Sequence, residues 1–248
     1  MARILGISKD RTSGRCFVEI RDAVTALTNL PVCFMAHVHV PPAGSIVYHW
    51  ENGPLEHEAT LAVASEIWDF SARNTARYPE SVAPLVRCVP CGHHPSMERF
   101  EPSPEPEFDV AWFGSINARR FRVLRRLRRE GLSVIEVPGT TFGRARDRMI
   151  ARARVVLNMR YYEDGLFPVL RSAHATANLM PCIAEDSPEI PSWVSRRCGY
   201  DDIPTRVAAL ARASPEHRRA VAHEAREMFR AQPLVLPLAL GAPSERVR

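Results

Sequence analysis

Short apolar runs alternate with amphipathic stretches along most of this chain. The runs are bounded by Gly, Pro or Asn, as is typical of buried strands in a parallel sheet, and the stretches between them carry apolar residues at helical spacing. The predicted strands of the first half are 4–7, 32–38, 45–48, 67–70 and 85–89. The predicted helices are 19–30, 56–66 and 71–78, the last capped by Ser71. This alternation favours a parallel sheet with helices on both faces.

The alternation of predicted strands and helices is interrupted by a Pro-rich acidic stretch, 100–108, and continues after it. Proline there excludes a helix interior or a central strand, so the stretch predicts an interdomain linker. Beyond it, strands are predicted at 109–113, 132–137, 155–159 and 181–184, and helices at 117–130, 144–152, 168–178, 201–213 and 215–230. The apolar run Leu234–Leu240, broken by Pro237, is a strand or an extended arm. We therefore expect an α/β protein with two Rossmann-like βαβ domains facing a cleft, 1–104 and 105–248.

Composition adds little to this prediction. The chain has 248 residues, of which 46% are apolar, and a net charge of +5 carried almost entirely by Arg. The Arg bias makes the charge weak support for a nucleic-acid partner, although it suits a phosphorylated ligand. With no run of about 18 apolar residues and no signal pattern at Met1–Asp10, a cytoplasmic protein without a membrane span is expected. Six scattered cysteines predict reduced thiols rather than a disulfide scaffold.

A small-residue turn, Gly114-Ser115, joins the strand at 109–113 to a helix that starts near Asn117. Such a turn exposes main-chain N–H groups at the positive end of the helix dipole, which suits a diphosphate. A plain strand-to-helix turn would have the same sequence. A diphosphate site and a plain turn are therefore both open hypotheses for Gly114-Ser115.

The most informative stretch runs from Asn158 to Arg171, where a strand end leads into a loop carrying Tyr161 and Glu163. Function concentrates in loops at the carboxyl ends of strands. A carboxylate at Glu163 suits ribose hydroxyls, and the Arg171 guanidinium suits phosphate oxygens. The alternative is a surface ion pair beside an aromatic cluster.

Several segments of the chain resemble bacterial glycosyltransferase-like proteins related to the CgeB and YkvP group. The resemblance is carried by Asp-Val-Ala-Trp-Phe-Gly-Ser from Asp109, by Ala-Arg-Val-Val-Leu-Asn-Met-Arg-Tyr-Tyr-Glu up to Glu163, and by Ile-Ala-Glu ending at Glu185. In the first half, Ile-Val-Tyr-His-Trp-Glu and Ile-Trp-Asp-Phe-Ser-Ala-Arg-Asn are similar to the same proteins, so the resemblance covers roughly 45–206.

This resemblance implies a compact GT-B fold with a nucleotide-sugar donor held by the second domain and an acceptor against the first. It places Gly114, Ser115 and Glu185 on the donor side, and it puts Glu163 at the first carboxylate of a Glu-x7-Glu motif. Arg171 occupies the second position. This departure puts the ribose contact and a retaining mechanism in doubt.

An inverting transferase needs a general base on the first domain. Glu51 and His49 follow a predicted strand and alternate with period two, so they are the candidates for that base. Trp50, Asn74 and, more weakly, Asp69 are acceptor-side candidates. His37 and His39 precede Pro41-Pro42 and are expected in a loop.

Two further patterns are weighed against simpler explanations. Cys88-Val-Pro-Cys91-Gly-His93-His94 resembles half of a zinc site, but no second Cys pair stands at zinc-ribbon spacing, so no metal is expected. Seven Arg in 119–129 suit nucleic-acid phosphates, but Phe121, Val123, Leu124 and Leu127 at helical spacing favour an amphipathic helix with a solvated basic face. Arg119 or Arg120 then lies in its first turn, near the donor phosphates.

Three functions follow from the sequence. The leading one is a metal-independent glycosyltransferase that uses a nucleotide-diphospho-sugar as substrate, without a cofactor, and acts on an unidentified small-molecule or glycan acceptor. The alternative is a catalytically inactive nucleotide- or sugar-binding module of the same fold. The third, a nucleic-acid-binding protein, rests on Arg content alone. Donor sugar, base, acceptor, stereochemical outcome and oligomeric state are left open.

Overall fold

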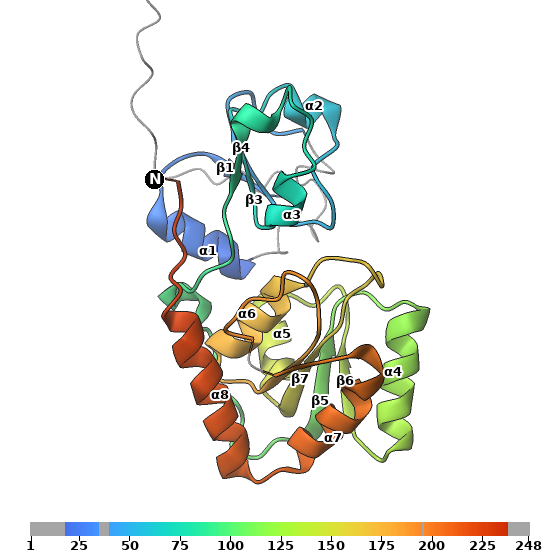
Figure 1. Ribbon diagram of the computed structural model, residues 1–248. Coiled ribbons are helices and arrows are strands. Elements are labelled where there is room, and N and C mark those ends of the chain that lie inside the picture. Colours follow the sequence, from blue (N-terminus) through green and yellow to red (C-terminus); the bar gives the residue numbers. More distant parts are fainter. Residues whose placement is uncertain (1–17, 35–39, 195, 238–248) are drawn as a thin grey trace, which may run out of the picture. The chain divides into compact units, whose positions relative to one another are not determined.

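The computed structural model describes residues 18–34, 40–194 and 196–237 (Figure 1). The chain divides into two compact units, one of residues 1–8, 23–90 and 234–248, the other of residues 9–22 and 91–233. This contact-based division follows Pro90, whereas the sequence predicts a domain boundary after residue 104. The predicted strand 4–7 and the two histidines at 37 and 39 lie outside the described residues.

The first unit is built on a four-stranded parallel sheet in the order β1-β2-β3-β4. The strands are β1 (Val32–Cys33), β2 (Ile46–His49), β3 (Glu66–Asp69) and β4 (Val86–Cys88). The helices are α2 (Glu58–Leu61), α3 (Ala72–Thr75) and the 3-10 turn η2 (Ala83–Leu85), and α1 (Val18–Leu27) contributes residues to both units. Buried Cys33, Val47, Leu55, Ile67 and Tyr78 form the core. The parallel sheet predicted from the apolar runs is confirmed.

The second unit has a five-stranded parallel sheet in the order β6-β5-β7-β8-β9. Its strands are β5 (Phe108–Phe113), β6 (Val134–Val137), β7 (Ala153–Asn158), β8 (Cys182–Glu185) and β9 (Arg197–Cys198). Its helices are α4 (Ala118–Arg129), α5 (Gly143–Ile150), α6 (Val169–Ala177), α7 (Ile203–Arg212) and α8 (Pro215–Arg230), with 3-10 turns η3 (Pro95–Met97) and η4 (Tyr200–Asp202). Every strand and helix predicted for this half is present, and β9 is an addition.

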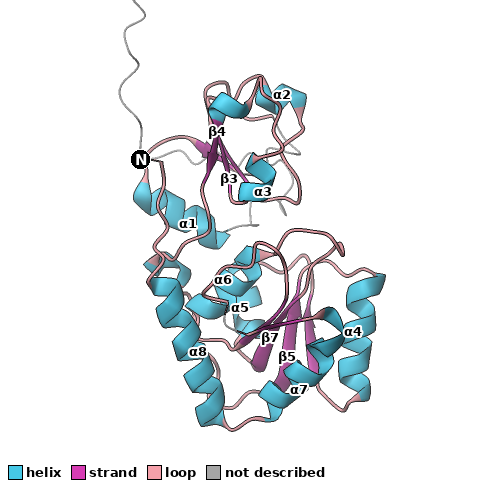
Figure 2. Cartoon of the chain, viewed as in Figure 1, coloured by secondary structure: helices cyan, strands magenta, loops and turns pink. Residues whose placement is uncertain are grey.

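Period-two alternation in β5 explains how helices cover both faces of this sheet (Figure 2). Val110 and Trp112 pack with residues of α4 and α7, whereas Ala111 and Phe113 pack with residues of α5 and α6. All four side chains are at least nine-tenths buried. A near-continuous apolar run is what a strand buried on both faces requires.

The strand order creates a topological switch point between β5 and β7. The chain leaves β5 through α4 to β6 on one side, and then returns to β7 on the other side. At such a point the two connections diverge and leave a crevice beyond the carboxyl ends of the strands, where open α/β sheets bind ligands. The segments after Phe113 and after Asn158 meet at this edge.

Three local features differ from the sequence expectations. The Pro-rich stretch is irregular, as predicted, but it lies within the second unit, because the Asn178 side chain accepts hydrogen bonds from the N–H groups of Arg99 and Phe100. The predicted helix 56–66 is reduced to α2. Phe121 is half-exposed rather than part of the apolar face of α4. The part of the terminal run up to residue 237 contains no strand and so agrees with an extended arm, one of the two alternatives left open.

Two further expectations concern membrane-spanning helices and the state of the cysteines. Among the described residues, no helix combines the length and the apolar character that crossing a bilayer demands. Cys33, Cys91, Cys182 and Cys198 are free thiols.

Candidate functional site at the switch point

The turn after β5 leaves main-chain donors exposed. Gly114 has a φ of +117°, a region open to glycine, and Asn117 caps α4 by accepting a hydrogen bond from the N–H of Arg120. Within the described residues, the N–H groups of Ser115, Ala118 and Arg119 make no hydrogen bond. The turn therefore has the free donors and the helix dipole that the sequence predicts for a diphosphate site.

Arg171 reaches from α6 across to this turn. Its Nε donates to the Phe113 carbonyl at 2.7 Å, and its Nη1 donates to Oδ1 of Asn158 at 2.6 Å and to the Met159 carbonyl at 3.3 Å. These bonds fix the guanidinium plane, while the described residues offer no acceptor to Nη2. A Cβ built on Gly114 would overlap Nη2. The terminal nitrogen of Arg171 thus lies directly against the glycine of the turn.

Asn158 holds Arg171 in place. Its amide Nδ2 donates to the Pro168 carbonyl at 3.0 Å and to Oγ of Ser172 at 2.7 Å, so its Oδ1 is oriented toward Arg171. Asn158 is fully buried. The residue predicted to bind donor therefore has a positioning role through the guanidinium.

A second buried guanidinium, Arg120, lies beside the first. Its three nitrogens donate to the carbonyls of Ser115, Met159 and Arg160, and its Cζ lies 4.9 Å from the ring centroid of Trp112. Arg171 lies 4.5 Å from the same ring centroid. Burial, followed by the charge of Arg120, lowers the pKa of Arg171 to about 9, and burial lowers that of Arg120 to about 10. Neither Arg171 nor Arg120 forms an ion pair with a described carboxylate.

Glu185, at the end of β8, neutralises two other arginines. Its carboxylate accepts from both terminal nitrogens of Arg119 and from the main-chain N–H, Nε and Nη2 of Arg160. Burial would raise the pKa of Glu185, but hydrogen bonds and the charges of Arg119 and Arg160 outweigh it and hold the pKa below its usual value. The oxygens of this predicted donor-binding residue are thus engaged within the protein.

The edge carries an excess of positive charge. Arg119 and Arg160 share the buried carboxylate of Glu185, whereas Arg120 and Arg171 bond to carbonyl and amide oxygens without a carboxylate. Buried charges without partners are costly, so such an arrangement favours an anionic ligand that supplies the missing countercharge. The pattern of free N–H groups and Nη2 gives the ligand donors for its oxygens.

The loop after β7 forms the outer part of this edge. Tyr161 is 37% exposed, its carbonyl accepts from Nδ2 of Asn117, and its ring lies 5.0 Å from Cζ of Arg120. Tyr162 packs edge-on against it, and Glu163 is exposed. Phe167 is buried instead. A surface ion pair is the alternative that the sequence leaves open for this stretch. Arg171 instead bonds to Phe113, Asn158 and Met159.

The acceptor-side candidates form a separate network in the first unit. Asp69 is fully buried and accepts from the Ser71 N–H, the Asn74 Nδ2 and the Tyr78 hydroxyl. Asn74 also accepts from the Gly53 N–H and donates to the Glu51 carbonyl. This network ties the loop after β2 to the helix after β3, so Asn74 and Asp69 have clear structural roles.

The two candidate bases differ in their surroundings. His49 is 4% exposed, and its Nε2 lies 2.9 Å from the Gly53 carbonyl, which requires a proton on Nε2. Glu51 is half-buried in the loop that follows. Trp50 stacks on Phe70 with ring centroids 5.1 Å apart.

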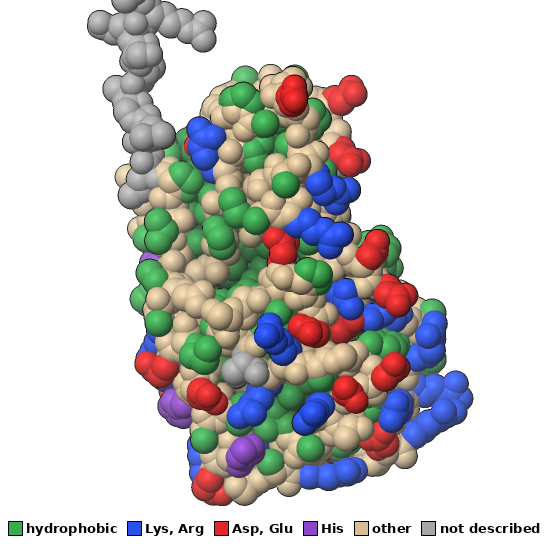
Figure 3. Space-filling view, viewed as in Figure 1, with side chains coloured by type: hydrophobic (Ala, Val, Ile, Leu, Met, Phe, Trp, Pro, Cys, Tyr) green, Lys and Arg blue, Asp and Glu red, His purple; other side chains and the backbone are tan. Residues whose placement is uncertain are grey.

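The remaining patterns resolve as follows. Cys91 is buried, Cys88 is exposed and His93 bonds to Glu98 at 2.9 Å. In the part of the chain that the structure covers, no group of three or more His, Cys, Asp or Glu side chains is placed to hold a metal ion. Arg side chains line the outer side of α4 (Figure 3), opposite buried Val123, Leu124 and Leu127, as an amphipathic helix predicts.

Comparison with known sequences gives distant relatives. No family model matches the chain. Uncharacterized protein L138 of Acanthamoeba polyphaga mimivirus is 27% identical over 118 residues, which cover 45% of this chain and 13% of that protein. Uncharacterized protein L140 of the same virus is 28% identical over 82 residues, covering 33% of this chain and 27% of that protein. The matches span a minor part of these relatives, and they give no support to a bacterial origin.

Comparison with solved structures gives low similarity. The Glycosylation Associate Protein (Gap123) complex from Streptococcus agalactiae aligns with 85% of this chain and 54% of that one, at a TM-score of 0.44 and 7% identity. The apo form of the lipopolysaccharide outer core galactosyltransferase WaaB aligns with 90% of this chain and 79% of that one, at a TM-score of 0.41 and 14% identity. With both TM-scores below 0.5, the switch-point geometry rather than these alignments carries the functional argument.

Proposed function

We propose that this chain is a glycosyltransferase that binds the diphosphate of a nucleotide-sugar at the switch point of the second unit. The observation that carries the proposal is the guanidinium of Arg171 against Gly114, with Nη2 and the N–H groups of Ser115, Ala118 and Arg119 left as donors. The motifs that resemble CgeB/YkvP-related proteins lie in the same segments. The diphosphate is the leaving group of sugar transfer, so a site that binds it stabilises the negative charge that develops on it.

In this proposal the protein replaces a divalent ion with fixed charge. Guanidinium groups and the dipole of α4 offset the charge of the departing diphosphate, so the reaction is metal-independent. Tyr161 and the exposed Glu163 are the proposed contacts for the nucleoside, and Asn158 acts through Arg171. Because Glu185 is engaged by Arg119 and Arg160, we propose that it positions these arginines rather than binding ribose.

Deprotonation of the acceptor hydroxyl is assigned to Glu51 or His49 of the first unit. In neutral His49 the Nε2 proton is held by the Gly53 carbonyl, so the basic atom is Nδ1. Trp50 would supply an apolar surface for a sugar ring. These assignments rest on the sequence resemblance and on the position of the residues after β2.

The test is nucleotide binding measured by calorimetry after a thermal-shift screen of UDP, GDP, dTDP and CMP sugars. Loss of a charge-assisted hydrogen bond costs about 1.5–3 kcal/mol, so R171A should weaken nucleotide-sugar binding at least tenfold. The matched control is R152A, which removes an exposed Arg that is paired with Glu107 elsewhere in the same unit. Equal affinities for wild type and R171A would overturn the proposal.

A second candidate, a binding module without transfer activity, is favoured by the Arg at the position of the second motif carboxylate. The two functions separate in a donor hydrolysis assay with EDTA present. A transferase hydrolyses its bound donor slowly in the absence of acceptor. A pure binding module gives the same calorimetric signal with no release of sugar.

A further inference from the structure

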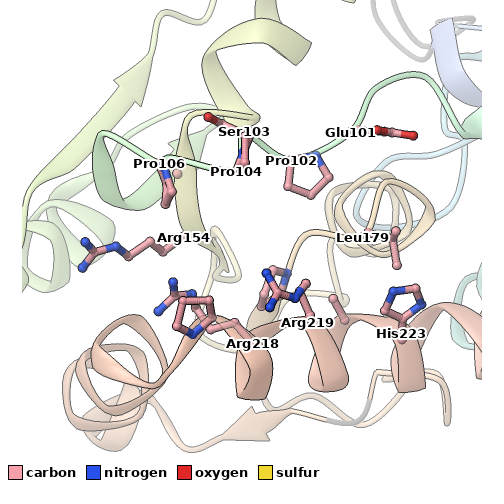
Figure 4. A pocket seen from close by; sticks show the side chains of 14 residues that line it. Glu101, Pro102, Ser103, Pro104, Pro106, Arg154, Leu179, Arg218, Arg219 and His223 are labelled. Atoms are coloured by element: carbon pink, nitrogen blue, oxygen red, sulfur yellow. The ribbon is translucent and has the colours of Figure 1, made fainter.

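A pocket of about 360 Å³ lies at the opposite edge of the same sheet (Figure 4). It is bounded by the Pro-rich segment 101–106, by the start of β7 at Ala153, by Pro181 just before β8 and by α8. These are the amino ends of the strands, whereas the switch point lies at the carboxyl ends. Six residues of β7 separate the two edges by about 20 Å, so this pocket is independent of the proposed donor site.

The pocket is preformed by main-chain contacts. At one end of the Pro-rich segment, the Asn178 carboxamide accepts from the N–H groups of Arg99 and Phe100. Farther along, the N–H of Ser103 donates to the Ala151 carbonyl at 2.8 Å. Pro102, Pro104 and Pro106 line the cavity with rigid apolar rings. A cavity of this size with fixed walls is in the range that binds small organic molecules.

The polar groups of the pocket are mainly cationic. Three guanidinium groups, those of Arg154, Arg218 and Arg219, line it together with the His223 ring and one carboxylate, Glu101. Arg218, Arg219 and His223 rise from α8 toward the prolines opposite (Figure 4). These side chains offer donors to a negatively charged group on the ligand.

Contacts within the protein engage only some of the hydrogen-bond donors of these arginines. Arg154 donates through Nη1 to Asp109 and Arg219 donates through Nη2 to Glu216, but Arg218 donates through Nη1 to the carbonyls of Ala211 and Ala213. Nε of Arg154 is a buried donor with no partner among the described residues. That atom has essentially no exposed surface, so a ligand anion would instead be bound by Arg218, which has no carboxylate partner among the described residues.

Leu179 is a fixed apolar part of the pocket wall. It follows the end of α6 with a φ of +56°, a conformation that glycine adopts without strain and a leucine does not. Its side chain lines the pocket. This conformation ends α6, where the N–H of Met180 donates to the Ala175 carbonyl at 2.9 Å and fixes Leu179 at the pocket wall.

We propose that this pocket binds a small organic anion, an apolar body that carries one phosphate or carboxylate group. The apolar body packs between the prolines and Leu179, and the anionic group binds to the guanidiniums of Arg218 and Arg154, with Arg219 at the pocket's open side. The site is separate from the sugar-nucleotide site and adds a second ligand to the protein.

The test is calorimetric titration of the full chain with 1-naphthyl phosphate, 1-naphthoate and neutral 1-naphthol. We expect one of the two anions to bind, with 1-naphthol at least tenfold weaker. R219E, at an exposed position, should weaken anion binding at least tenfold. The matched control is R125E on α4, which makes the same change in charge on an exposed arginine outside the pocket and should leave binding unchanged.

L179G separates binding from folding. Glycine relieves the strained φ and removes the apolar wall, so the unfolding midpoint should stay near that of wild type while anion affinity falls at least fivefold. R171A should bind the anion as wild type does. No binding of either anion by the wild type, wild-type affinity in both R219E and L179G, or loss of binding in R171A would each overturn the proposal.

Discussion

Gly114 and Arg171 are packed so closely that a methyl group on Gly114 would collide with the guanidinium. The Cβ position lies 3.4 Å from Cζ of Arg171 and overlaps Nη2. Arg171 cannot simply swing away, because Nε and Nη1 are held by the Phe113 carbonyl, Asn158 and the Met159 carbonyl. A residue from the β5 turn and one from α6 therefore define a single anion-binding element, on which the proposed function depends.

G114A should damage this element in two ways. Alanine is strained at a φ of +117°, and its methyl group displaces Arg171, so we expect a loss of about 2–4 kcal/mol in the free energy of unfolding and at least tenfold weaker nucleotide-sugar binding. The matched control is G131A, where φ is also positive, at +82°, but nothing lies within 4 Å of the Cβ position. Chemical denaturation and calorimetry should show that G131A loses about 1–2 kcal/mol of stability and no affinity.

E185Q should destabilise the second unit strongly. Glutamine keeps the shape of the side chain but leaves Arg119 and Arg160 without their countercharge, and breaking a buried ion pair costs about 3–5 kcal/mol. E136Q is the control, because the pair between Glu136 and Arg128 is partly exposed and such pairs contribute about 0–1 kcal/mol. Similar losses in the two variants would contradict the role assigned to Glu185.

Glu185 should also contribute to acid sensitivity. Its folded-state pKa lies below the usual value of 4.5, so its stabilising effect is complete above that value and is lost as the pH falls through the folded-state pKa. Wild-type stability should therefore fall from about pH 5 downward more steeply than the stability of E185Q. Urea unfolding at a series of pH values measures the two slopes, and parallel curves would exclude this contribution.

N74A should test whether Asn74 is structural. The substitution leaves the Gly53 N–H without its acceptor and removes one of the donors to Asp69 in a buried network, which we expect to cost about 2–3 kcal/mol of stability. T75A on the same short helix removes a hydroxyl bond to the Ala72 carbonyl at an exposed position and should cost less than about 1 kcal/mol. A stable N74A protein that fails only in sugar transfer would return Asn74 to the acceptor site.

E51Q tests the proposed general base. Removing a general base lowers kcat by about 100-fold to 10,000-fold, whereas donor binding in the second unit does not involve Glu51. Transfer should therefore fall with the calorimetric donor affinity unchanged. If H49Q reproduces this behaviour and E51Q remains active, His49 is the base.

The second half of the chain shows how far the sequence determines this fold. Apolar runs such as Asp109–Phe113 and capped amphipathic stretches such as Asn117–Glu130 depend on local chemistry, so they predict the β-strands and helices within a residue or two. Weak local signals fail, as at Arg197–Cys198, which becomes a strand only because β8 offers an open edge. The same limit explains Phe121, whose place on the helix face is filled by Arg120 over Trp112.

The sequence predicts which residues form the candidate site, but it does not predict the role of each one. Gly114, Asn158 and Arg171 are recognisable in the sequence, because small turn residues and polar strand ends stand out against apolar runs. Three relationships join residues that are far apart in sequence. Gly114, Asn158 and Arg171 form one element, Arg119 and Arg160 neutralise Glu185, and Leu179 lines a pocket with the Pro-rich segment and α8. Only the tertiary structure decides such relationships, because hydrogen bonding and burial depend on which segments the sheet order brings together, and no local pattern encodes that order.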